Sequence, residues 1–376
     1  MKPQPRSAIM ACRIRRPKRP QQRNDHGEND VTGFDDPEMQ DLLGLAARLG
    51  RDPLVVQGPG GNISLKRDGV MWVKASGTWM MEATSRPILI PVDFVAVLDG
   101  LAAGDPACET CSEFVRHDLV RSPLRPSIET TLHAVMPQRV VVHVHCVETI
   151  SIACLSDATE RLAASLTGLS WTFVPYVRPG ASLGRTMVEH LRAGTNIVVL
   201  GKHGLVVAAD SVVEAERLRA EVSRRLARTV RTAPNVDREA LRRAQGGGYA
   251  SAEDDELHAI ATDPISLAAA RRGSLYPDHV VFLGPGIIET EGTETAADAA
   301  RRAGRPDAPM VVVAGAGVLL HSTATSSARA LARCLADVAC RLASDDPVNP
   351  LSAADEAQLL NWDAEKYRQS LDQRVS

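Results

Sequence analysis

The sequence lacks a large net charge of either sign. It holds 43 Lys and Arg residues against 46 Asp and Glu residues, a formal charge of −3 over 376 residues. Eight basic and three acidic side chains fall within residues 1–32, so the rest of the chain is acidic. Because nucleic-acid binding needs a basic face, we expect no nucleic-acid partner. Residues 1–32 are predicted to form a disordered basic tail.

Long apolar segments are also missing. The longest run, Met310–Leu320, is well short of the roughly 20 residues that a membrane-spanning helix needs. The basic residues near the N-terminus are not followed by an apolar segment, so no secretory signal is predicted. Seven cysteines form an odd number and lack the density of a disulfide scaffold. These features favour a cytoplasmic protein with no membrane partner.

The length predicts two folded domains, since a domain averages about 150 residues. Short β-rich runs alternate with helical stretches over residues 33–235, which predicts an α/β domain. Residues 236–263 are charged and rich in glycine, as expected for a linker. The alternation resumes over residues 264–345, which predicts a small α/β domain of unknown role. Residues 346–376 are predicted to form a helical C-terminal tail.

Two histidines on one predicted strand carry the first chemical signal. Side chains alternate along Arg139–His145, so His143 and His145 share a face and lie about 6.5 Å apart. Two imidazoles placed in this way can bind one metal ion, and a catalytic zinc site has three protein ligands and one open position. Two residues are candidates for the third ligand: His133, which lies upstream, and His203, which lies in a Gly-Lys-His-Gly turn.

A carboxylate and two polar loops accompany the histidines in the sequence. Glu129 lies at a predicted helix start, where the helix dipole favours it, and a carboxylate beside a bound substrate can act as a general base. The loop Gln57–Ser64 and the segment Lys74–Thr78 are rich in Gly, Ser and other small polar residues. Such loops let backbone amides approach an anion closely. They predict a clamp for a phosphate or a carboxylate.

Five motifs together resemble the class II aldolase/adducin family. They are Gly61-Asn62-Ile63-Ser64, Ala75-Ser76-Gly77, Pro126-Ser127-Ile128-Glu129-Thr130-Thr131-Leu132-His133, His143-Val144-His145 and Lys202-His203-Gly204. Their order and spacing are similar to those of the family, and the resemblance covers roughly residues 35–232. It implies an α/β/α layered domain with a central, mainly antiparallel sheet flanked by helices, and assembly as a homotetramer.

The resemblance implies a role for each matched position. It makes His143, His145 and His203 the ligands of a divalent metal, most often zinc, and Glu129 the catalytic acid and base. The implied phosphate-binding residues are Asn62, Ser76, Gly77 and Ser127. His133 falls at a position that packs near the site without binding the metal.

One position departs from the pattern of the aldolases. Ile128 takes the place of the second serine in their Ser-Ser-Glu phosphate loop, which removes a hydroxyl donor. Lys74 is expected to compensate by presenting a cation to a phosphate or a carboxylate.

The activity that the resemblance implies is that of a metal-dependent carbon–carbon lyase. Such an aldolase would cleave a ketose phosphate or a related sugar acid through a metal-stabilised enediolate. Other members of the family decarboxylate, epimerise or dehydrate sugar phosphates on the same scaffold, although the epimerases usually carry aspartate where Glu129 lies. Adducin-like members are non-catalytic binding or scaffold proteins that lack the full set of metal histidines, and the complete set here favours catalysis.

The C-terminal part resembles another segment of known proteins. Phe282–Gly286 and Leu360–Tyr367 are similar to the region after the aldolase domain in bacterial bifunctional aldolase/short-chain dehydrogenases. Val313–Gly317 suggests a nucleotide-binding loop, but Leu320 stands where the third glycine of that motif belongs. Nicotinamide binding is therefore not expected.

Overall fold

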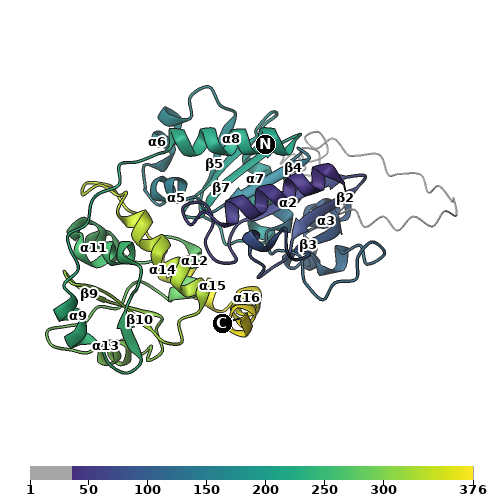
Figure 1. Ribbon diagram of the computed structural model, residues 1–376. Coiled ribbons are helices and arrows are strands. Elements are labelled where there is room, and N and C mark those ends of the chain that lie inside the picture. The colour runs from purple at the N-terminus through teal and green to yellow at the C-terminus, as the bar shows by residue number, and fades with distance from the viewer. Residues whose placement is uncertain (1–35, 376) are drawn as a thin grey trace, which may run out of the picture.

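The computed structural model describes residues 36–375, so the tail predicted over residues 1–32 lies outside the described residues. Figure 1 shows a larger domain built around a long sheet and a smaller domain that the chain forms afterwards. None of the described helices is both long enough and apolar enough to cross a membrane.

The larger domain comprises the elements from α2 to α8. They are α2 (Pro37–Gly50), β1 (Asn62–Arg67), β2 (Val70–Lys74), η1 (Met80–Glu82), β3 (Leu89–Asp93), α3 (Phe94–Ala103), η2 (Pro106–Glu109), η3 (Ser112–Phe114), α4 (Thr130–Val135), β4 (Val140–Val144), α5 (Val147–Ala153), α6 (Ala158–Ser165), β5 (Trp171–Val174), α7 (Ala181–His190), β6 (Ile197–Leu200), β7 (Gly204–Ala209) and α8 (Val212–Arg225).

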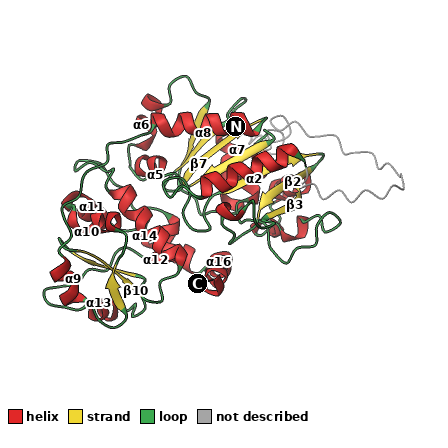
Figure 2. Ribbon diagram, viewed as in Figure 1, coloured by secondary structure: helices red, strands yellow, loops and turns green. Residues whose placement is uncertain are grey.

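Seven strands form the sheet of this domain, in the order β3-β2-β1-β4-β7-β6-β5. Every neighbouring pair is antiparallel except β5 and β6, which are parallel. Helices α2 and α8 pack on one face (Figure 2), and α3, α4 and α7 pack against one another on the other face. The predicted α/β class, with a mainly antiparallel sheet between helices, is confirmed.

The central strand β4 is buried along its whole length. Its five residues pair with β1 on one side and with β7 on the other. Because helices cover both faces of the sheet, no position of the strand faces water, and the strand is a nearly continuous apolar run. Only the end of the strand departs from this apolar run, because His143 lies within β4 and His145 directly follows it.

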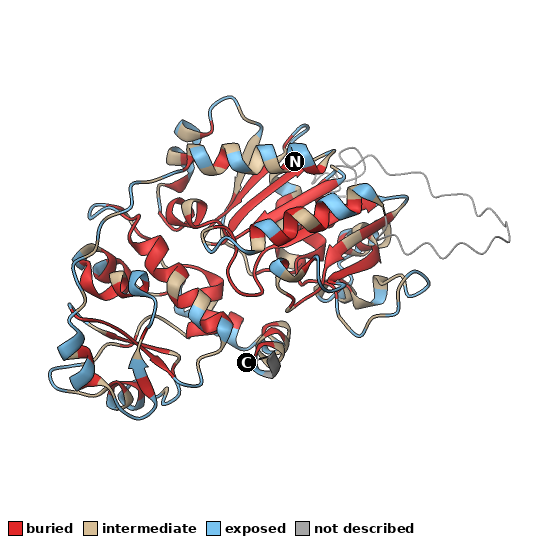
Figure 3. Ribbon diagram, in the orientation of Figure 1, coloured by how far each residue is buried: buried red, intermediate tan, exposed pale blue. Residues whose placement is uncertain are grey.

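The sequence of helix α2 explains why it forms a helix and packs against the sheet. The side chain of Asp36 accepts a hydrogen bond from the backbone N–H of Met39, and Pro37 occupies the first turn. Leu42, Leu45 and other apolar residues at helical spacing then form one buried stripe. Figure 3 shows this buried stripe against the sheet.

The smaller domain comprises the elements from α9 to α16. They are α9 (Arg238–Ala244), β8 (Tyr249–Ser251), η4 (Asp255–His258), α10 (Ala259–Thr262), α11 (Pro264–Ala270), α12 (Pro277–Leu283), α13 (Ala296–Arg302), β9 (Met310–Val313), β10 (Gly317–His321), α14 (Ser326–Ala339), α15 (Ala353–Leu360) and α16 (Asp363–Val375). Its three-stranded antiparallel sheet has the order β8-β10-β9.

Residues 236–263, expected to be a linker, instead form part of the smaller domain. This segment contains α9, β8 and α10, and β8 pairs with β10. The glycines that suggest a flexible connection have a different use. Gly246, Gly247 and Gly248 have positive φ angles of 145°, 60° and 91°, as the turn that leads into β8 requires.

The two domains share one hydrophobic core, and the C-terminal helix returns to the larger domain. Val147 and Ile150 of α5 belong to the same buried cluster as Leu331 and Leu335 of α14. Near α16, the guanidinium of Arg125 lies 4.4 Å from the ring centre of Tyr367. The tail predicted as helical is therefore a packed element, formed by α15 and α16.

A buried lysine in strand β1 predicts a pH-dependent stability. The Nζ atom of Lys66 donates to the carbonyls of Met136 and Gln138, and burial lowers the pKa of this amine to about 7. Since the unfolded chain holds its proton up to about pH 10, the folded state gains stability as pH rises above 7.

The unfolding free energy of the wild type should rise between pH 7 and pH 9. We expect this rise to be about 2 kcal/mol smaller in Lys66→Met. Urea unfolding at the two pH values measures it. Lys366→Met, at a half-exposed side chain, is the control and should follow the wild type. Equal slopes in all three proteins would contradict the prediction.

Candidate metal centre

The end of β4 and the adjoining β6–β7 turn bring three histidines together. His143 lies within β4 and His145 directly follows it, while His203 occupies the turn between β6 and β7. Lys202 has a φ angle of 57°, and Gly204 packs against the carbonyl of Val144 where a side chain would not fit. The turn is thereby held against the end of β4, as the antiparallel pairing of β4 with β7 requires.

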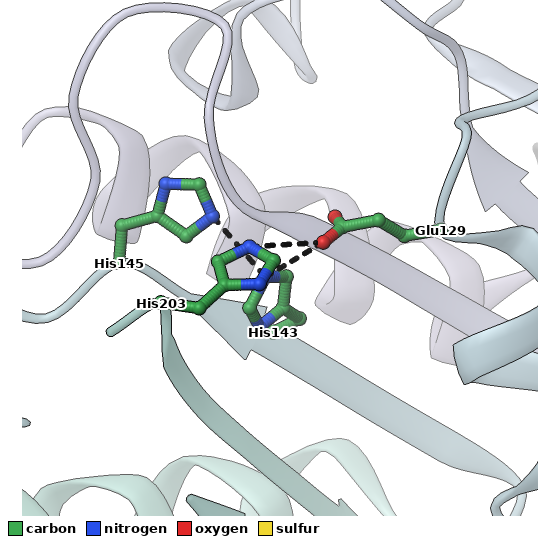
Figure 4. Close-up of side chains that lie close together, drawn as sticks. All are labelled: Glu129, His143, His145 and His203. Atoms are coloured by element: carbon green, nitrogen blue, oxygen red, sulfur yellow. Dashed lines mark hydrogen bonds and ion pairs between the residues drawn. The ribbon is translucent and has the colours of Figure 1, made fainter. Parts of the chain in front are cut away.

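The three imidazole rings form a nearly equilateral triangle. Their centres are separated by 4.9 Å, 4.9 Å and 5.0 Å, and all three residues are buried. The Nε2 atoms of His143 and His145 are 3.1 Å apart. Figure 4 shows the rings turned toward a common point.

Glu129 completes this group from the residue before α4. Its Oε1 atom lies 3.2 Å from Nε2 of His143 and 3.1 Å from Nε2 of His203 (Figure 4). One ligand atom from each of the four residues lies within 4.8 Å of every other. Tetrahedral bonds of 2.0–2.1 Å would separate two ligand nitrogens by about 3.3 Å. Glu129, His143, His145 and His203 therefore have the chemistry and the spacing to hold a divalent cation.

Charge interactions within the cluster compensate for the hydration that its ionisable groups lose on burial. Burial would raise the pKa of Glu129, but the imidazoles of His143 and His203 outweigh it and hold this pKa well below its usual range. Burial likewise opposes the protonation of His143, yet the Glu129 carboxylate raises the pKa of that imidazole. Burial lowers the pKa of His145 to about 4, so this ring is neutral at pH 7.

Hydrogen-bonding groups behind two of the rings fix their orientation. Nδ1 of His143 donates to the backbone carbonyl of Leu205, at 3.0 Å. Nδ1 of His145 lies 3.0 Å from Oδ2 of Asp278, which belongs to α12 of the smaller domain. Sequence reasoning missed Asp278, because no motif or spacing connects a residue of one domain with a histidine of the other.

A small cavity adjoins three of the four residues and is lined in part by the smaller domain. Its volume is about 20 Å³, room for about one water molecule. Glu129, His145 and His203 line it from the larger domain, and Asp278, Glu365 and Arg368 line it from α12 and α16. Sequence reasoning missed Glu365 and Arg368 as well, since the C-terminal tail carries no chemical motif.

The predicted anion-binding residues fall into two groups. Ser76, Gly77 and Ser127 line the cavity. Oγ of Ser76 has no hydrogen-bond partner within the described residues. Gly77, with a φ angle of 74°, lies against the side chain of Leu371 from α16. Asn62 is fully buried beside the cavity wall, and its Nδ2 donor has no partner in the described part of the chain.

The structure also shows the surroundings of Lys74, Ile128 and His133. Nζ of Lys74 donates to the carbonyls of Pro59 and Thr78, at 3.1 Å and 2.7 Å, so its hydrogen bonds go to the backbone. Ile128 lines the cavity with its apolar side chain. His133 is completely buried, and its Nδ1 is 2.8 Å from Oγ of Ser64. It lies outside the four-residue cluster.

The comparison with known families decides the identity of the larger domain. A family model, the class II aldolase and adducin N-terminal domain, matches residues 40–230, about half of the chain. The chain belongs to the class II aldolase and adducin family. The resemblance found in the motifs is thus confirmed over the domain that carries the cluster.

Similar proteins match part of the chain. The uncharacterized oxidoreductase YuxG of Bacillus subtilis (strain 168) is 32% identical over 187 residues, which cover 46% of this chain and 27% of YuxG. The chain therefore spans about a quarter of the length of this curated relative.

Solved structures of the family are also similar to the chain. One is the N-terminal class II aldolase domain of a conserved protein from Thermoplasma acidophilum, with 25% identity and a TM-score of 0.45, covering 55% of this chain and 98% of that one. Another is the L-fuculose-1-phosphate aldolase of Thermus thermophilus, with 15% identity and a TM-score of 0.33, covering 50% of this chain and 89% of that one.

Gly60 gives a test of how tightly the cluster is packed. A Cβ atom at this position would lie 2.8 Å from the carbonyl oxygen of Gln57 and 2.8 Å from Nδ1 of His145. We expect Gly60→Ala to lower the unfolding free energy by about 1–3 kcal/mol, because the loop or the imidazole must shift. Urea unfolding measures the change.

The matched control is Gly44→Ala in helix α2. The nearest atom to a Cβ there is 3.6 Å away, at the end of Arg48. Alanine in a helix should stabilise the protein by about 0.5–1 kcal/mol. If both variants had the same stability, the close packing around His145 would have no energetic consequence.

Proposed function

We propose that the protein is a metal-dependent carbon–carbon lyase of the aldolase type, acting on a ketose phosphate or a related sugar acid. The observation that carries the proposal is the convergence of three imidazole nitrogens and one carboxylate oxygen beside a cavity. Membership of the class II aldolase and adducin family supports it.

In this proposal His143, His145 and His203 hold the divalent ion through their Nε2 atoms. Nitrogen ligands at this number and spacing favour zinc. When bound, the ion would supply a Lewis acid for the carbonyl and hydroxyl oxygens of the substrate and would stabilise the negative charge that bond cleavage leaves.

Glu129 moves the proton in the same proposal. Its carboxyl group lies beside the cavity and faces the histidines, so in its protonated form it is placed to return a proton to the substrate carbon after cleavage. In the condensation direction it removes that proton. Burial excludes bulk water from this exchange, which strengthens the electrostatic interactions of the carboxylate.

In this proposal the cavity would also hold the anionic part of the substrate. Ser76, Gly77 and Ser127 line it, and the unpaired Oγ of Ser76 is a donor for an oxyanion. Lys74 would act there only through the charge of its protonated form, since its hydrogen bonds go to carbonyls and burial lowers the pKa of its amine to about 7. A cavity of about 20 Å³ is too small for a sugar, so substrate binding requires displacement of α12 or α16.

Metal content tests the proposed ligands. We expect about one divalent ion per chain in the wild type and much less in His143→Ala or His203→Ala, because only two of the three ligand imidazoles remain. Plasma mass spectrometry measures the content. His117→Ala, at an exposed position, is the control and should keep the ion. A wild-type protein that takes up neither zinc, manganese nor cobalt would overturn the proposal.

The role of Glu129 requires a separate test. Glu129→Gln should retain the metal and lower the rate of aldol cleavage by about 10²–10⁴-fold, since the amide cannot transfer the proton. The assay screens ketose phosphates and follows the aldehyde released. Glu113→Gln, at an exposed residue, is the control. Full activity in Glu129→Gln would assign the proton transfer to another group.

A further inference from the structure

A carboxylate of the smaller domain reaches the metal cluster of the larger one. Asp278 lies in the first turn of α12 and is 4% exposed. Its Oδ2 atom is 3.0 Å from Nδ1 of His145, which is a hydrogen-bonding distance. This oxygen is buried and makes no hydrogen bond of standard geometry in the described part of the chain. The imidazole of His145 is therefore the group that this oxygen faces.

The nitrogen that Asp278 faces decides what the other nitrogen of the ring can do. A neutral imidazole carries one proton, so a proton held on Nδ1 leaves a lone pair on Nε2. Nε2 of His145 is the atom that points toward His143 and the centre of the cluster (Figure 4). An acceptor at Nδ1 thus prepares His145 as a ligand.

His143 provides an internal comparison. Its Nδ1 donates to the carbonyl of Leu205, a group of its own domain, and its Nε2 faces the cluster. A backbone carbonyl accepts a hydrogen bond but cannot donate one, so it fixes the same arrangement of the proton. Asp278 stands in the same relation to His145 as Leu205 does to His143, but it comes from the other domain.

Asp278 is itself held in place from the C-terminal helix. Its Oδ1 atom is 3.2 Å from the guanidinium of Arg368, which also contacts both oxygens of Glu365, at 3.0 Å and 2.9 Å. Arg368 and Glu365 are 8% and 2% exposed, so the three residues form a buried network. The network connects α12 and α16 to the ring of His145.

We infer that Asp278 is a positioning residue of the metal centre. Its carboxylate accepts the Nδ1 proton of His145 and directs the Nε2 lone pair toward the ion. This inference rests on the proposed function, because it assumes that His145 binds a metal. It gives the smaller domain a task, which is to set the metal affinity of a site whose ligands all belong to the larger domain.

Cobalt(II) titration of the metal-free protein tests the inference. Tetrahedral Co²⁺ absorbs visible light, so the titration reports affinity and geometry without any activity assay. In Asp278→Asn the amide can donate to Nδ1 and favour the opposite tautomer, in which Nε2 carries the proton. We expect Co²⁺ to bind about 10- to 100-fold more weakly than in the wild type, with an altered spectrum.

Asp337→Asn is the matched control. Asp337 is a buried carboxylate of the same domain, 8% exposed and paired with Arg333, but it does not line the cavity. This variant should lose stability while binding Co²⁺ like the wild type. If folded Asp278→Asn also binds Co²⁺ like the wild type, the inference is overturned and the proposed lyase is untouched. If the wild type binds no Co²⁺, the proposed metal site fails as well.

A measurement on the wild type covers the case in which Asp278→Asn does not fold. Long-range ¹H–¹⁵N correlation of the histidine rings, with His145 assigned through His145→Gln, reports which nitrogen carries the proton. The inference requires the proton on Nδ1 in the metal-free protein. A proton on Nε2 of His145 would overturn it.

Discussion

The convergence of three imidazoles and a carboxylate at one buried point is the constraint on which the rest of the structure depends. Ionisable groups lose hydration when they are buried, and they are tolerated only where each one finds a partner. Glu129 supplies the charge that faces His143 and His203, and Asp278 supplies the charge that faces His145. The two carboxylates come from different domains, so the cluster needs both domains in place.

The sheet makes this convergence possible. Strand β4 ends in the middle of the sheet, where β1 and β7 flank it and helices cover both faces. A histidine at this end cannot turn away to water, because the space around it is filled. Gly60 and Gly204 reinforce the effect, since a side chain at either position would collide with His145 or with the carbonyl of Val144. The positions of the rings are thus consequences of strand pairing and close packing.

These features also explain how much the sequence alone could predict. Alternation along the strand places His143 and His145 on one face, and the family motifs select Glu129 and His203, so the local part of the site was predictable. The mainly antiparallel sheet was predictable from the family resemblance. The hydrogen bonds of Lys74 were not, because an amine before a polar loop has the same pattern whether it binds an anion or backbone carbonyls. The glycines of residues 246–248 have the composition of a linker, although the φ angles show a turn.

The contribution of the smaller domain depends on contacts that no sequence spacing encodes. Asp278 and Arg368 are separated by 90 positions, and neither is near His145 along the chain. Such a buried chain of charges is costly to break, since removing one member leaves the others unpaired. Separation of the domains would expose the apolar core that they share and leave these charges without partners. The packing of α12 and α16 and the geometry of the metal cluster are therefore coupled, and a displacement that admits substrate must keep Asp278 at His145 or weaken the hold on that ring.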